Sequence, residues 1–79
     1  MARTLDVRGL RCPLPLIRTR AELAVLPAGE ALEVLATDPE APIDLAALAA
    51  DEGLEFSSTE SDGEWRISLR PAARGPRAG

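Results

Sequence analysis

The sequence predicts an α/β protein of the α+β kind, a two-layer sandwich in which two helices cover one face of a four-stranded mixed sheet. Strand-like and helix-like patterns follow one another along the chain in the order β-α-β-α-β-β. The last two strand patterns flank Asp62-Gly63, a strong signal for a tight hairpin turn. The length of 79 residues fits one small domain.

The first strand and the first helix are predicted before residue 27. Residues 4–8 alternate polar and apolar side chains, as a half-buried strand does, and Gly9 ends this pattern. A helix is expected over residues 13–26, where apolar residues recur every three or four positions. The apolar face of this helix would be formed by Leu14, Ile17, Ala21 and Ala24, with Leu16, Leu23 and Val25 beside it.

The later elements are separated by proline and glycine residues. A second strand is predicted over 30–37, a second helix over 43–52, and the two hairpin strands over 54–60 and 64–70. On the last strand, Trp65, Ile67 and Leu69 are expected to face the core. Residues 71–79 contain only Ala, Arg, Gly and Pro, so we expect a folded domain of residues 1–70 followed by a disordered tail.

Charge is distributed unevenly along the chain, whose net charge is −4. All nine basic residues are arginines in segments 1–20 and 66–79, whereas residues 21–65 contain twelve acidic residues and no basic one. If the first and last strands lie close together, a basic face would form on an acidic body. Ordinary solvated surface charge explains the pattern equally well. Direct nucleic-acid binding is disfavoured, because Phe56 and Trp65 are the only aromatic residues.

Cys12 is the only cysteine, and the chain contains no histidine, lysine or tyrosine. The chain therefore has no imidazole base, no Schiff-base amine and no phenol, and the side chains left to take part in chemistry are one thiol, the arginines and the carboxylates. One cysteine without histidine makes neither an internal disulfide nor a zinc site of the usual kind. We therefore expect no metal, no cofactor and a reducing, cytoplasmic setting. No apolar run is long enough to span a bilayer, so no membrane partner is expected.

The surroundings of Cys12 in sequence predict a reactive thiol. Pro13 suits the first position of a helix, which would make Cys12 the N-cap at the positive end of the helix dipole. Alternatively, the helix begins at Pro15, because the residue before a proline avoids helical angles. Three arginines near the thiol would also lower its pKa; they are Arg8, Arg11 and Arg18. The competing interpretation is that Cys12 is a small buried apolar residue.

The segment Gly9-Leu10-Arg11-Cys12-Pro13-Leu14-Pro15 resembles the Gly-Leu-x-Cys-Pro-x-Pro signature of the TusA/SirA sulfur-carrier family. The resemblance extends over roughly residues 4–70. Other features of the family pattern are an aspartate before the signature, a basic residue early in the helix, Pro-x-Gly-Glu before the second strand and Asp-Pro after it. They correspond to Asp6, Arg18, Pro27-Ala28-Gly29-Glu30 and Asp38-Pro39.

This resemblance implies that Cys12 carries a persulfide. The sulfur would come from a donor protein, such as a cysteine desulfurase or a rhodanese-like protein, and would pass to an acceptor protein. The chain would then be a persulfide sulfurtransferase or carrier rather than a self-contained enzyme. Residues that would stabilise the sulfur or dock partners are Arg11, Arg18 and Arg8; those that would shape the motif are Gly9, Pro13, Pro15, Asp38 and Pro39.

Two questions stay open at the level of sequence. Leu14 stands between the two prolines, where members that serve tRNA thiolation often carry an acidic residue. This difference argues against tRNA thiolation and leaves sulfur oxidation, cofactor sulfuration and selenium metabolism open. A non-catalytic regulatory or adaptor module could use the same basic face to bind a protein. We expect a monomer, because no long unpaired apolar stripe is evident in the sequence.

Overall fold

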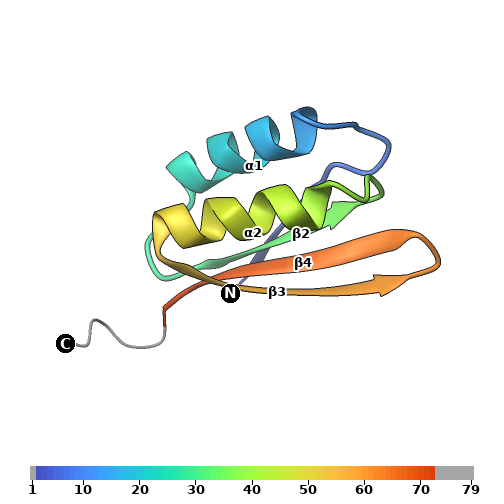
Figure 1. Cartoon of the computed structure of the whole chain (residues 1–79). Coiled ribbons are helices and arrows are strands. Elements are labelled where there is room, and N and C mark those ends of the chain that lie inside the picture. Colours follow the sequence, from blue (N-terminus) through green and yellow to red (C-terminus); the bar gives the residue numbers. More distant parts are fainter. Residues whose placement is uncertain (1, 73–79) are drawn as a thin grey trace.

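The computed structural model describes residues 2–72 and confirms the predicted order of elements. The bounds are β1 (Ala2–Asp6), α1 (Leu14–Val25), β2 (Ala31–Ala36), α2 (Ala41–Glu52), β3 (Leu54–Ser61) and β4 (Glu64–Pro71). The strands form one mixed sheet in the order β1-β2-β4-β3, with β1 parallel to β2 and the other pairs antiparallel. Both helices cover the same face of this sheet (Figure 1), as the sequence predicts.

Several boundaries differ from the prediction by one or two residues. The first strand ends at Asp6 rather than at residue 8, although the next residue, Val7, is fully buried and its N–H donates to the Leu35 carbonyl at 2.8 Å. At the other end, Pro71 belongs to β4 and lies opposite Leu54, so the predicted tail boundary is wrong at this position. Residues 73–79 of the predicted tail lie outside the described residues.

The hydrophobic core lies between the sheet and the helices. Every second residue of β2 is buried, which is the pattern of a strand with one covered face. The sheet contributes Leu32, Val34, Ala36, Ile67 and Leu69 to the core, and α2 contributes Ala41, Leu45, Leu48 and Ala49. Trp65 and Phe56 are partly buried and pack against this cluster. The predicted inward face of β4 is therefore confirmed.

The apolar face predicted for α1 is not the face that packs on the sheet. Leu14, Ile17 and Val25 are 45%, 52% and 67% exposed, and Ala21 and Ala24 are exposed as well. The buried residues of α1 are Pro15 and Thr19, with Leu16 and Leu23 partly buried. The helix is apolar on more than one side, and only one side can contact the sheet. We refer to Leu14, Ile17, Ala21, Ala24 and Val25 as the outer stripe.

The outer stripe removes the sequence argument for a monomer, which depended on the absence of such a stripe. Contiguous exposed apolar surface often marks a contact with another molecule. No helix among residues 2–72 is long and apolar enough to cross a membrane.

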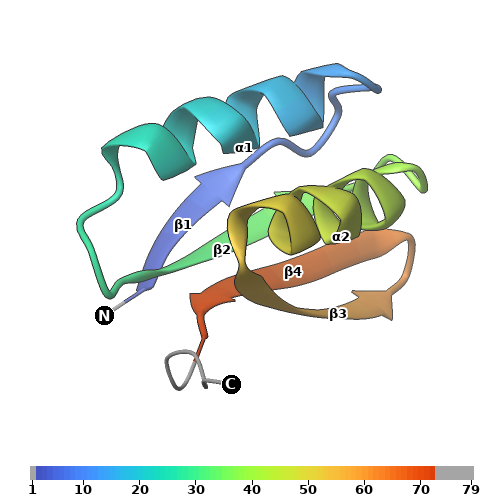
Figure 2. The same cartoon turned by 60° about the vertical axis from the view of Figure 1, so that its left-hand side comes forward.

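The topology brings two connections to one edge of the sheet. Because β1 and β2 are parallel, both end at this edge, and each is followed by a helix (Figure 2). The Cys loop, residues 7–13, therefore lies beside the α2 turn, residues 37–40. These two segments carry most of the sequence motif.

The inward and outward faces of α2 should differ sharply in their contribution to stability. Leu45→Ala removes a fully buried side chain, and we expect the free energy of unfolding to fall by about 2–5 kcal/mol. Ile43→Ala, at a position that is 65% exposed, serves as the control and should change it by no more than about 0.5 kcal/mol. Urea denaturation measures both values, and similar losses for the two variants would contradict this packing.

Candidate functional site

Cys12 lies exposed in the Cys loop, one residue before the N-cap of α1. The N-cap is Pro13 and the first helical residue is Leu14, so the helix begins between the two alternatives that the sequence offers. Cys12 is therefore not the N-cap, and its exposure excludes the alternative of a buried apolar residue. Pro15 is in the first turn and is buried, which fixes the start of the helix against the core.

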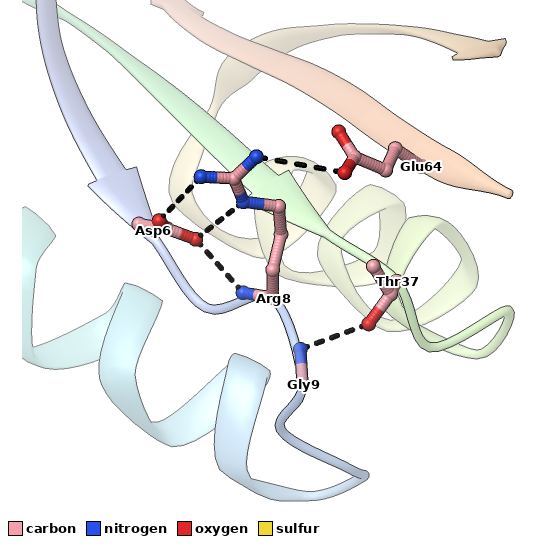
Figure 3. A network of polar contacts seen from close by, with 5 residues as sticks. All are labelled: Asp6, Arg8, Gly9, Thr37 and Glu64. Atoms are coloured by element: carbon pink, nitrogen blue, oxygen red, sulfur yellow. Dashed lines mark hydrogen bonds and ion pairs between the residues drawn. The ribbon is translucent and has the colours of Figure 1, made fainter. Parts of the chain in front are cut away.

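The α2 turn holds the Cys loop through hydrogen bonds to main-chain N–H groups. The N–H of Cys12 donates to Asp38 Oδ2 at 2.6 Å, and the other oxygen of Asp38 accepts the N–H of Glu40 at 3.0 Å. The N–H of Gly9 donates to Thr37 Oγ1 at 2.9 Å (Figure 3). Hydrogen bonds from the main-chain N–H groups of Glu40 and Cys12 lower the pKa of Asp38.

The thiol of Cys12 points toward a carboxylate rather than toward a cation. Its S–H donates to Asp44 Oδ2 at 3.4 Å, and Asp44 lies in the first turn of α2. This hydrogen bond raises the pKa of the Cys12 thiol above its usual value, with further contributions from desolvation and from the charges of Asp38 and Glu40. The sequence-based expectation of a lowered pKa is therefore wrong.

Part of the reason for this error lies in Arg8, whose guanidinium is bound by carboxylates of the same chain. It pairs with Asp6 at 2.8 Å and with Glu64 at 3.5 Å (Figure 3). Hydrogen bonds from Arg8 lower the pKa of Asp6 to about 2, and the same partners raise the pKa of Arg8. The basic side chain closest to the end of β1 is thus directed toward the β3–β4 hairpin.

The other arginines among residues 2–72 fall into two groups. Three of them form ion pairs within the chain, as Arg8 does. These pairs are Arg3 with Glu22, Arg66 with Glu33 and Arg70 with Glu55. Among the arginines that the structure describes, Arg11, Arg18 and Arg20 form no ion pair, and all three are exposed. Arg11 is in the Cys loop and the other two are on α1. The charged groups that act on the thiol are therefore the carboxylates of Asp44, Asp38 and Glu40, and not these arginines.

Asp44 is the site residue that sequence reasoning missed. It is separated from Cys12 by 32 positions, and nothing near it in sequence marks it as functional. Its place was nevertheless predictable in part, because the helices that follow two parallel neighbouring strands begin at the same edge of the sheet. An acidic residue in the first turn of the second helix is consequently a candidate neighbour for a residue that lies just before the first helix.

A surface hollow of about 390 Å³ lies between the Cys loop and the α2 turn. It is lined by Gly9, Leu10, Arg11, Thr37, Asp38 and Pro39. Motif residues from both connections therefore line one surface hollow. In residues 2–72, no three His, Cys, Asp or Glu side chains are grouped so that they could hold a metal ion.

The family model described as "Sulfurtransferase TusA" matches residues 3–70, almost all of the folded part. This chain belongs to the TusA family. Over 60 residues it is 45% identical to Bacillus subtilis YrkF, whose name gives sulfur carrier as a provisional role; the match covers 76% of this chain and 32% of YrkF. The chain thus spans about a third of that relative.

In two further comparisons, the match covers most of this chain and most of the other protein. The chain is 39% identical over 59 residues to the sulfur carrier protein TusA of Allochromatium vinosum, covering 75% of this chain and 78% of that protein. A SirA-like protein of Desulfitobacterium hafniense has a crystal structure that superposes with a TM-score of 0.79 at 28% identity, covering 89% of this chain and 96% of that one. The resemblance to the TusA/SirA family is thereby confirmed.

The anchoring role of Asp38 can be tested through the amide protons that it binds. In Asp38→Ala the Cys12 N–H loses its acceptor, so we expect its hydrogen exchange to accelerate by on the order of tenfold in native conditions. The Val7 N–H, bonded to the Leu35 carbonyl, should keep its protection, and Asp51→Ala serves as a charge-matched control. Unchanged exchange at Cys12, followed by NMR, would show that the loop does not depend on Asp38.

Proposed function

We propose that this chain is a sulfur carrier in which Cys12 accepts a sulfane sulfur as a persulfide from a donor protein and delivers it to an acceptor protein. The observation that carries the proposal is the exposed Cys12 thiol in a loop anchored by Asp38, in a chain of the TusA family. The names of its relatives, which include a sulfur carrier protein, support the same role.

The transfer needs only thiol chemistry. The Cys12 sulfur attacks the outer sulfur of a donor persulfide, the donor S–S bond breaks, and the electron pair leaves on the donor thiolate. The proton of Cys12 ends on that donor thiol, so one thiol and one persulfide are exchanged for another thiol and persulfide without net oxidation. Delivery to the acceptor is the same exchange, with the Cys12 persulfide as the donor.

The site fits transfer within a protein complex rather than free catalysis. Cys12 is exposed on the surface and does not line an enclosed cavity, so a partner supplies the other wall of the reaction site. Because the pKa of the Cys12 thiol is raised, a smaller fraction of Cys12 in the free carrier is the nucleophilic thiolate. Contact with a partner then has to favour the thiolate.

The outer stripe and the free arginines are the proposed docking surface for these partners. Leu14 and Ile17 lie in the first turn of α1, just after the Cys loop, and Arg11 and Arg18 lie close to them in sequence. An apolar centre with a cationic border is complementary to a partner patch that is apolar and edged with carboxylates. We assign docking to Arg11 and Arg18, and to Arg8 the support of the Cys loop through its ion pairs.

An adaptor module is the second candidate function, and the outer stripe favours it as much as it favours a carrier. Such a module would bind a protein through α1 and use no thiol chemistry. The two functions differ in what they require of Cys12. An adaptor keeps its activity in Cys12→Ser, whereas a sulfur carrier loses all of it.

Sulfur loading can be measured by the intact mass of the protein. After incubation with a cysteine desulfurase and cysteine, with rhodanese and thiosulfate, or with polysulfide, we expect the native chain to gain one sulfur atom that a reductant removes. Cys12→Ser should keep the fold and gain nothing, because it lacks the only thiol. Equal gains in both proteins, or none from any donor, would exclude the carrier function.

Docking can be separated from sulfur chemistry by charge reversal on α1. Arg18→Glu should slow loading from the protein donor that works best by about tenfold or more, with little effect on loading from polysulfide. Arg66→Glu, on the opposite face of the sheet, disrupts only an exposed ion pair and serves as the control. Equal effects of the two variants on the initial loading rate would show that α1 is not the docking surface.

A further inference from the structure

The charged groups around the Cys12 thiol come from several segments. Asp44 approaches from α2 and accepts the S–H hydrogen bond, and Asp38 and Glu40 act on the thiol from the α2 turn. Arg11 of the Cys loop interacts with Asp38, and Arg18 lies further along α1. Three carboxylates thus act on the sulfur, and only one of them touches it.

Building on the proposed carrier function, we propose that Asp44 selects the sulfur donors of Cys12 by charge. It slows loading from small anionic donors, such as polysulfide, and favours a persulfide from a protein that places a cationic group against the Asp44 carboxylate. Asp44 is thereby a specificity-determining residue in contact with the reacting sulfur.

The geometry gives a physical reason for this selection. An incoming sulfur must approach the Cys12 Sγ, and the carboxylate oxygen of Asp44 is 3.4 Å from that atom. A polysulfide or thiosulfate anion therefore meets negative charge at the position where it would react, with Asp38 and Glu40 adding to the repulsion. Negative charge is also favourable in the first turn of α2, where Asp44 lies, because of the helix dipole.

A protein donor can remove the same obstacle. A lysine or arginine that pairs with Asp44 competes for the oxygen that accepts the S–H bond and offsets the charge that favours the protonated thiol. The thiolate then attacks the outer sulfur of the donor persulfide, and the proton released by Cys12 ends on the donor thiolate that leaves. The exchange balances without any oxidant or reductant.

Asp44→Asn tests the charge while it keeps the shape and the ability to accept a hydrogen bond. The matched control is Asp51→Asn, an exposed aspartate in the last turn of the same helix. Both variants lose one negative charge from α2, so a difference between them reports the position of Asp44 and not the net charge.

The first readout uses two alkylating reagents that differ in charge, neutral iodoacetamide and anionic iodoacetate. At pH 7 we expect Asp44→Asn to raise the iodoacetamide rate by about three- to tenfold, because more of the thiol is ionised. The ratio of the iodoacetate rate to the iodoacetamide rate should rise by a further factor of about two to five. The pH profile of the iodoacetamide rate should move to lower pH. Asp51→Asn should change none of these, and an unchanged ratio in Asp44→Asn would overturn the inference.

The second readout is sulfur loading. Asp44→Asn should load from polysulfide about tenfold faster than the native chain and should gain no comparable advantage with a cysteine desulfurase. Equal acceleration with both donors would overturn selection by charge and leave the carrier function intact. A changed reagent ratio without sulfur uptake from any donor would instead exclude the carrier function, while Asp44 would still be shown to screen the thiol from anions.

Discussion

The hydrogen bond from the Cys12 N–H to Asp38 is the constraint on which the site depends. It joins two connections that are far apart in sequence and that meet only because β1 and β2 are parallel neighbours. With its second oxygen, Asp38 also binds the main chain at Glu40, just before α2 begins. One side chain therefore sets the position of the thiol relative to the first turn of α2, and the contact between Cys12 and Asp44 follows from it.

This anchoring leaves the thiol exposed to solvent, while neighbouring carboxylates lower its tendency to ionise. Exposure alone would make a lone cysteine vulnerable to oxidation and to adventitious electrophiles, since the thiolate is the reactive form. In this fold the nearest charges are negative, and they raise the pKa of the thiol even though water can reach it. Accessibility and reactivity are thus set by separate parts of the structure, the Cys loop and the start of α2.

Sequence patterns predicted the order of elements, the hairpin at Asp62-Gly63 and the exposure of Cys12, because each depends on residues close together in the chain. They did not predict which side of α1 is buried, because the helix is apolar on two sides and only packing on the sheet decides which of them becomes buried. They also failed for the charge at the thiol. The pairing of Arg8 with Glu64 spans 56 positions, and the contact with Asp44 spans 32, so both arise from tertiary structure alone.

The pairing of arginines within the fold also shapes the electric field of the whole molecule. Among the arginines of residues 2–72, four are paired with neighbouring carboxylates, whereas Arg11 in the Cys loop and Arg18 and Arg20 on α1 form no ion pair; the net charge of the chain is −4. A negative body with a localised positive region has a permanent dipole moment. In the field of a charged partner such a molecule rotates as it diffuses, so it presents the α1 side to a negative surface before contact.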